Sequence, residues 1–186
     1  MRRFCWLTLP LLFVPTAALA QEKGEWSIWG YYGQSWFILG SEDIRRGGGL
    51  AVQYARHEPR FKFWGKEGKL VFEANATHTV GGNKFEWEGD TTIALGVLAL
   101  ARYETRPRKG LATYLEGGWG FQWADKHTID LPSHFNSTPV LGAGVILPLK
   151  NTEVYLGVRY IHISNAGTVG NNPGQNQVFF MAGVKF

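Results

Sequence analysis

The segment from Glu153 to Ser164, EVYLGVRYIHIS, alternates between two kinds of side chain with a period of two residues. The apolar positions of this alternation are Val154, Leu156, Val158 and Tyr160. The positions between them are Tyr155, Gly157 and Arg159. Because successive side chains of a strand point to opposite sides of a sheet, the segment is predicted to be a strand with one apolar and one mixed face.

Seven other segments have strand length, and two of them alternate as clearly. They are Glu25–Ile38, Gly48–Phe63, Lys69–Val80, Thr91–Tyr103, Leu111–Trp123, Thr138–Pro148 and Asn176–Phe186. No run of 18 apolar residues follows the N-terminal segment, so a transmembrane helix is not predicted. Aromatic-rich strands of this kind are typical of a closed barrel, in which all backbone polar groups are paired within the lipid. The predicted fold is all-β, an eight-stranded antiparallel transmembrane β-barrel of the outer membrane.

The lengths of the connections predict how the barrel is oriented. The connections after the first, third, fifth and seventh strands are longer than the other three, which centre on 64–68, 104–110 and 149–152. In outer-membrane barrels the short turns lie in the periplasm and the long loops lie outside. The first strand is therefore expected to run outward and the last to run inward, ending in Phe186.

The N-terminus has the features of a secretory signal peptide. Arg2 and Arg3 precede an apolar run over Phe4–Val14, and Ala18-Leu19-Ala20 has the small residues of a cleavage site. We expect cleavage after Ala20. Residues 21–186 are then a single outer-membrane β-barrel domain of a Gram-negative cell.

Composition excludes several classes of function. The only cysteine, Cys5, lies in the signal peptide, so the mature chain has neither a disulfide nor a thiolate metal ligand. Nineteen Lys and Arg against 15 Asp and Glu give +4, and the loss of Arg2 and Arg3 leaves about +2, too little to indicate nucleic acid. No cofactor and no metal are expected.

Charged residues within strands indicate a polar interior. Glu73 and Glu116 fall on the faces opposite the apolar ones, and they are expected to pair with Arg102 or Arg159.

A second set of polar residues lies in the longest connection. His127 and His134 are flanked by Asp125 and Asp130, which is a weak metal pattern, and we interpret all four as solvated loop residues.

The strand at 153–164 also carries candidate catalytic groups. His162 and Ser164 continue its lipid-facing register, about 6.7 Å apart along the strand, so His162 could take the proton of Ser164. Counting back by twos from Phe186 places Asn176 on the same face of the last strand, where its oxygen could orient the His162 ring. The alternative is that these side chains only decorate the membrane boundary.

The loop that follows Ser164 offers a second element of such a site. Backbone N–H groups of Asn165–Gly167, with the Asn165 amide, could form an oxyanion hole.

The octapeptide Tyr160–Gly167, YIHISNAG, resembles the signature of PagL-type lipid A 3-O-deacylases. That resemblance implies an eight-stranded outer-membrane ester hydrolase that removes the 3-O-linked acyl chain of lipid A as a 3-hydroxy fatty acid. It assigns His162 as base and Ser164 as nucleophile, and associates Asn165 and Gly167 with the oxyanion hole. The implied partner is lipid A of lipopolysaccharide in the outer leaflet, and a homodimer is left open. The alternative is a non-catalytic barrel with a structural or adhesive role.

One position departs from the family. The orienting group there is a Glu twelve residues after the Ser, and here that position is Asn176, with neither Asp nor Glu between Asn165 and Phe186. An amide can fix the tautomer of a histidine but supplies no negative charge. From the sequence alone, replacing Asn176 with Glu is expected to keep or raise activity.

Two basic residues, Arg45 and Arg46, are candidates for contacts with lipid A phosphates. An equally good interpretation is a solvated pair of loop charges.

Overall fold

The computed structural model describes residues 24–82, 90–107, 111–170 and 172–186. The predicted signal peptide lies outside the described residues. The strands are β1 (Glu25–Ser35), β2 (Ile44–Phe63), β3 (Lys66–Gly82), β4 (Thr91–Thr105), β5 (Ala112–Ala124), β6 (Phe135–Ser137), β7 (Val140–Pro148), β8 (Glu153–Ile163) and β9 (Gln175–Lys185). Among the described residues, no helix is both long and apolar enough to cross a membrane.

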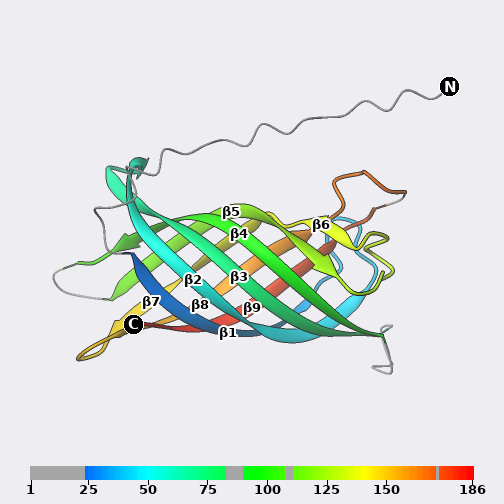
Figure 1. Ribbon diagram of the computed structural model, residues 1–186, viewed down its shortest axis with the longest axis horizontal. Coiled ribbons are helices and arrows are strands. Elements are labelled where there is room, and N and C mark those ends of the chain that lie inside the picture. The colour runs from blue at the N-terminus through cyan, green and yellow to red at the C-terminus, as the bar shows by residue number, and fades with distance from the viewer. Residues whose placement is uncertain (1–23, 83–89, 108–110, 171) are drawn as a thin grey trace.

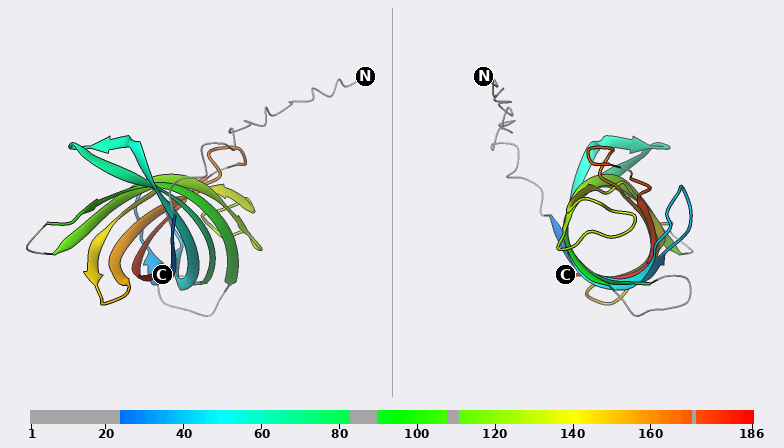
Figure 2. Two further views of the ribbon diagram at one scale, coloured as in Figure 1. Left: turned by 60° about the vertical axis from the view of Figure 1, so that its left-hand side comes forward. Right: turned by 90° about the vertical axis from the view of Figure 1, so that its right-hand side faces the viewer.

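Eight of these strands form a closed antiparallel barrel. Their order is β4-β3-β2-β1-β9-β8-β7-β5, and pairing of β4 with β5 closes the ring. Figure 1 shows the strands tilted across the long axis, and the view along that axis in Figure 2 shows the ring. The predicted eight-stranded barrel is therefore confirmed. The remaining strand, β6, was not predicted; it extends the edge of β5 beyond β7.

The connections differ in length at the two ends of the barrel, as predicted. Trp64 and Gly65 join β2 to β3, and their positive φ angles of 48° and 72° are those of a two-residue hairpin turn. The connections at the opposite end include loop 1 (residues 36–43, before β2), loop 3 (residues 125–139, around β6) and loop 4 (residues 164–174, before β9). They gather at the right-hand end of Figure 1.

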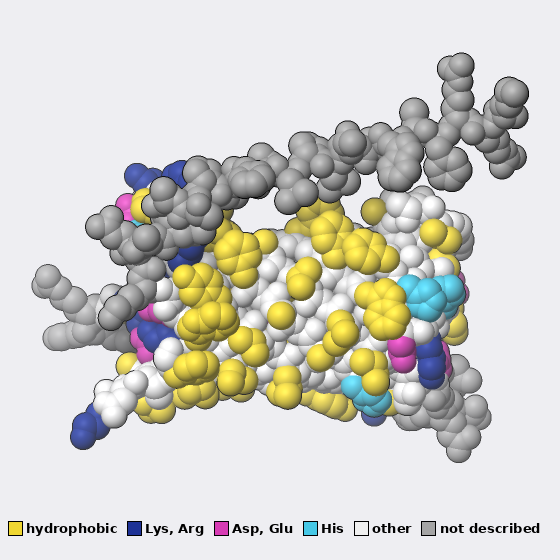
Figure 3. All heavy atoms as spheres, in the orientation of Figure 1, with side chains coloured by type: hydrophobic (Ala, Val, Ile, Leu, Met, Phe, Trp, Pro, Cys, Tyr) yellow, Lys and Arg dark blue, Asp and Glu magenta, His cyan; other side chains and the backbone are white. Residues whose placement is uncertain are grey.

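The outer wall is apolar. Leu156 and Val158 of β8 and Phe180 of β9 are exposed, whereas the side chains between them are mostly buried. Figure 3 shows hydrophobic side chains over the middle of the wall and charged side chains towards both ends. This distribution fits a membrane-spanning barrel whose ends reach water.

The interior contains a buried network of charges. Arg159 donates hydrogen bonds to Glu73 and Glu116, with nitrogen–oxygen distances of 2.6 to 3.0 Å. Arg102 donates to Glu116 and to Gln53. All five side chains are at most 4% exposed. The pairing of the luminal carboxylates with the two arginines is therefore confirmed.

Aromatic side chains fill the interior beside this network. The rings of Trp29, Tyr114 and Tyr155 contact one another, and the Arg102 guanidinium lies 5.2 to 5.5 Å from their centroids. Gly183 lies opposite Trp29 in register, and a Cβ there would come within 2.3 Å of the indole ring. The glycine therefore makes room for the largest side chain of the lumen.

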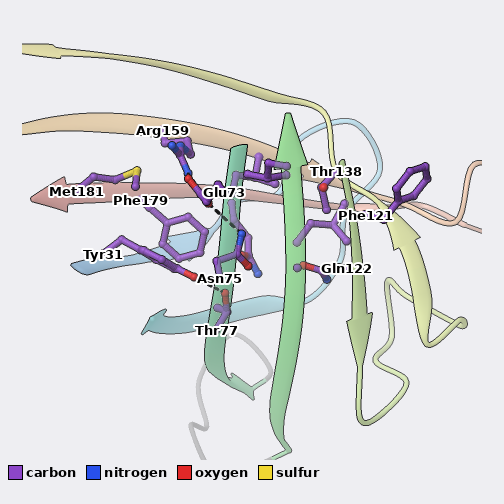
Figure 4. A pocket seen from close by; sticks show the side chains of 15 residues that line it. Tyr31, Glu73, Asn75, Thr77, Phe121, Gln122, Thr138, Arg159, Phe179 and Met181 are labelled. Atoms are coloured by element: carbon purple, nitrogen blue, oxygen red, sulfur yellow. Dashed lines mark hydrogen bonds and ion pairs between the residues drawn. The ribbon is translucent and has the colours of Figure 1, made fainter. Parts of the chain in front are cut away.

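The space left in the lumen is small. The cavity in Figure 4, beside Tyr31, Asn75 and Arg159, has a volume of about 20 Å³. That is room for about one water molecule. An acyl chain does not fit in this cavity.

Candidate hydrolase site

His162 and Asn176 are direct partners across the β8–β9 pair. Side chains at such positions lie on the same face with their Cβ atoms about 5 Å apart. His162 Nδ1 is 2.8 Å from Asn176 Oδ1, and Asn176 is completely buried. The structure thus brings together the two residues that counting along the strands had placed on one face.

The hydrogen bonds of Asn176 define the state of the His162 ring. Asn176 Nδ2 donates to the backbone oxygen of Ile38 at 2.6 Å. Because a carbonyl oxygen can only accept, the amide nitrogen must face Ile38 and the side-chain oxygen must face His162. Tyr160 also donates its hydroxyl to this oxygen at 2.6 Å. Because Oδ1 cannot donate, Nδ1 of a neutral His162 ring carries the proton and Nε2 is left as the base.

Ser164 is held by β6 rather than by a neighbouring barrel strand. Its N–H donates to Ser137 O at 3.1 Å, and Ser137 N–H donates to Ser164 O at 2.7 Å. Of the hydrogen bonds in the described part of the chain, none joins Ser164 Oγ to His162 Nε2. Hydrogen bonds of this kind often form only when substrate is present.

The predicted oxyanion loop is a tight turn. Asn165 O accepts the N–H of Thr168 at 3.1 Å, and Ala166 and Gly167 adopt positive φ angles of 54° and 75°. Asn165 Oδ1 accepts the Gly167 N–H at 2.8 Å, and its Nδ2 donates to Val169 O at 2.7 Å. Both predicted donors are therefore engaged within the loop in this state.

Gly174 limits the position of the His162 ring. It has a φ of +74°, and a Cβ there would lie 2.7 Å from His162 Cε1 and 3.2 Å from Nε2. Replacement by alanine is expected to displace the ring and cost most of the hydrolytic activity. The backbone strain of a positive φ adds about 1–2 kcal/mol of destabilisation. Turnover and heat-dependent gel mobility would be measured for the same preparation.

Gly170 is the matched control for that substitution. It has a positive φ of 51° in the same loop, but a Cβ there would contact nothing within 4 Å. Gly170→Ala should therefore show the strain without the loss of activity. Equal losses in both variants would contradict a steric role for Gly174.

Three features of the site were not found from the sequence. Tyr160 counts in the sequence only as an apolar position of its strand, although the two-residue period that places His162 on the outer face includes it. The Ile38 carbonyl is a backbone group with no sequence signal. The strand β6 is three residues long, too short for periodicity to detect.

The other sequence candidates lie elsewhere. Arg45 belongs to β2 and is 2% exposed in an ion pair with Asp43, so neither a contact with lipid phosphates nor a solvated loop charge describes it. Arg46 is exposed. Asp125, His127 and His134 are exposed loop residues, as interpreted, but Asp130 is completely buried. Among the described residues, no group of three or more His, Cys, Asp or Glu side chains could hold a metal ion.

A closed antiparallel barrel with an apolar outer wall defines a class, the β-barrels of the outer membrane. The family described as "Lipid A 3-O-deacylase (PagL)" matches residues 46–185. The chain belongs to this family, and it is an outer-membrane lipid A 3-O-deacylase.

Two solved structures have a similar fold. The outer-membrane enzyme PagL superposes with a TM-score of 0.61 at 18% identity, covering 84% of this chain and 97% of that one. Neisserial surface protein A (NspA) superposes with a TM-score of 0.54 at 19% identity, covering 87% of this chain and 95% of that one. A search of curated proteins gave no match.

Proposed function

We propose that Ser164, His162 and Asn176 form the hydrolytic site that removes the 3-O-linked acyl chain of lipid A. The observation that carries the proposal is the hydrogen bond from His162 Nδ1 to Asn176 Oδ1, two residues from Ser164 on the lipid-facing wall. It leaves Nε2 free to accept a proton. No cofactor is needed for this chemistry.

In the first step His162 Nε2 takes the proton of Ser164 as Oγ bonds to the ester carbonyl carbon. The carbonyl π electrons move to oxygen and give a tetrahedral oxyanion. When this collapses, the bond to the 3-position oxygen of the sugar breaks, and that oxygen takes the proton from His162. A water molecule then releases the 3-hydroxy fatty acid from Ser164 by the same sequence.

Donors for the oxyanion come from the turn after Ser164. In this proposal Asn165 and Gly167 provide them by exchanging their hydrogen bonds within the turn for bonds to the oxyanion. The N–H of Ala166, between them, makes no hydrogen bond to any residue that the structure describes. It is therefore available without any rearrangement.

The wall below the site is suited to an acyl chain. A depression of about 740 Å³ opens on the outer face of β1, β8 and β9. The outward-facing residues that line it are Gly30, Tyr32, Leu156, Val158, Phe180 and Ala182. Val158 and Leu156 continue the register of Ser164, His162 and Tyr160 towards the middle of the membrane. A chain whose ester lies at Ser164 can extend down this wall, where apolar contact is favourable.

The other elements of the proposal concern processing and assembly. The signal peptide, residues 1–20, is removed after Ala20, so residues 21–186 form the single mature domain. All the side chains of the site come from one chain, so a homodimer would not be needed to complete it.

The test is hydrolysis of purified lipid A by the refolded protein. Mass spectrometry should detect loss of one 3-hydroxy fatty acid from the 3-position and the same free acid in the medium. A non-catalytic barrel would leave lipid A unchanged. Release no faster than with lipid A alone, from protein shown to be folded by heat-dependent gel mobility, would contradict the proposal.

A further inference from the structure

We propose that loop 1 is a positioning element of the hydrolase site, and that Asp130 of loop 3 locks it in place. This inference rests on the proposed function, because the group that loop 1 positions is Asn176. It assigns roles to the Ile38 carbonyl and to the Asp130 carboxylate.

Loop 1 is joined to β9 beside the catalytic face. Trp36 N–H donates to the backbone oxygen of Asn176 at 2.8 Å, which extends the β1–β9 pairing by one bond. Two residues further on, the Ile38 carbonyl accepts the Asn176 side-chain amide at 2.6 Å. Loop 1 therefore holds both the backbone and the side chain of the residue that orients His162.

The Ile38 carbonyl explains why an amide fits at position 176. An amide can accept from His162 and Tyr160 with its oxygen while it donates to Ile38 with its nitrogen. A carboxylate would place an oxygen against the carbonyl oxygen, where two acceptors repel and neither is satisfied. The amide is therefore better suited to this position than a carboxylate of the same shape.

Asp130 fixes loop 1 from a distant part of the chain. Its carboxylate accepts the Ser41 hydroxyl at 2.6 Å and the N–H groups of Glu42 and Asp43 at 2.8 and 3.0 Å. The Asp130 side chain is completely buried. Three donors to one buried carboxylate are strong, charge-assisted bonds.

The two contacts are connected through one short stretch of backbone. Ser41 N–H donates to Ile38 O at 3.2 Å, so this carbonyl accepts from both Ser41 and Asn176. The path runs from Asp130 through Ser41 to Ile38, and from there through Asn176 to His162. Loop 3 also carries β6, which pairs with Ser164. One loop thus supports both the nucleophile and the group that orients the base.

The role of the Ile38 carbonyl is tested with Asn176→Asp, which changes the amide nitrogen to oxygen without changing the shape of the side chain. The expected result is a kcat lower by about tenfold to a hundredfold, as for a buried hydrogen bond replaced by two facing acceptors, with little change in KM. A kcat equal to or above the parent value would overturn this role. The parent's own activity tests the proposed function separately.

The role of Asp130 is tested with Asp130→Ala against the control Asp125→Ala. Asp125 lies in the same loop, and its exposed carboxylate accepts, from the residues that the structure describes, only the Ile93 N–H. We expect Asp130→Ala to lower kcat about tenfold or more, because loss of the carboxylate leaves three donors of loop 1 unpaired. Asp125→Ala should remain within about twofold of the parent, as expected for an exposed hydrogen bond.

A double-mutant cycle separates positioning from general stability. If Asp130 acts through Asn176, Asp130→Ala should have little further effect when Asn176 is already alanine. Nitrogen NMR should also show loss of the single Nδ1–H tautomer of His162 in Asp130→Ala. The same fold-loss in both backgrounds, or an unchanged His162 tautomer, would overturn the proposal.

Discussion

Replacing Ser164 with alanine is expected to reduce release of 3-hydroxy fatty acid from lipid A by more than about 10³-fold, as loss of the nucleophile does in other serine hydrolases. The substitution removes Oγ, the atom that attacks the ester carbon in the first step of the proposed mechanism. Hydrolysis by mass spectrometry and folding by heat-dependent gel mobility would be measured on the same sample.

The barrel itself should be unaffected by that change. The hydrogen bonds that anchor Ser164 to Ser137 are made by backbone atoms, which alanine retains. Ser137→Ala is the matched control, since it removes a hydroxyl on the directly opposite residue and should keep near-parent turnover. A Ser164→Ala variant as active as the parent would rule out the Ser-His mechanism.

The features that the sequence predicts correctly are those that follow from the two-residue period of a strand. Alternation placed Leu156 outside and Arg159 inside, and the same count put His162 and Asn176 on one face of adjacent strands. It also paired the luminal arginines with the luminal glutamates. Inward and outward positions alternate along every strand of a barrel, so an error in where a strand begins does not change which face its later residues occupy.

The features that sequence missed lie in the loops, where no period constrains the chain. Asp130 and Ser41 are hydrogen-bonded although they lie 89 residues apart in the sequence. The acceptor for the Asn176 side chain is the backbone carbonyl of Ile38, a group that every residue has and that gives no sequence signal. Arg45 was misplaced because β2 begins at Ile44, four residues earlier than predicted, so its side chain enters the lumen. The site thus combines two predictable strands with loops that only the structure reveals.

The largest effect on stability is expected at Arg159, the centre of the luminal network. Its guanidinium bridges Glu73 and Glu116, and all three groups are almost completely buried. Arg159→Ala should destabilise the barrel by about 3–5 kcal/mol, because it leaves buried negative charge without its partner. Within the described part of the chain, Glu116 retains Arg102, whereas Glu73 retains only the amide donors of Gln53 and Asn75, so the cost falls mainly on Glu73.

Because the cost falls on Glu73, the prediction is tested with a compensating substitution at Glu73 and with a control at an exposed arginine. Adding Glu73→Gln to Arg159→Ala should restore part of the stability, since it removes the unpaired charge while keeping the shape of the side chain. Arg60→Ala is the control, because the Arg60 side chain is 83% exposed and its partner Glu58 keeps a second cation in Arg56. Ion pairs of exposed side chains contribute little to stability. Urea unfolding in detergent would measure all three. If Arg159→Ala unfolds at the same urea concentration as Arg60→Ala, water in the lumen compensates the carboxylates, and the arginine is dispensable for stability.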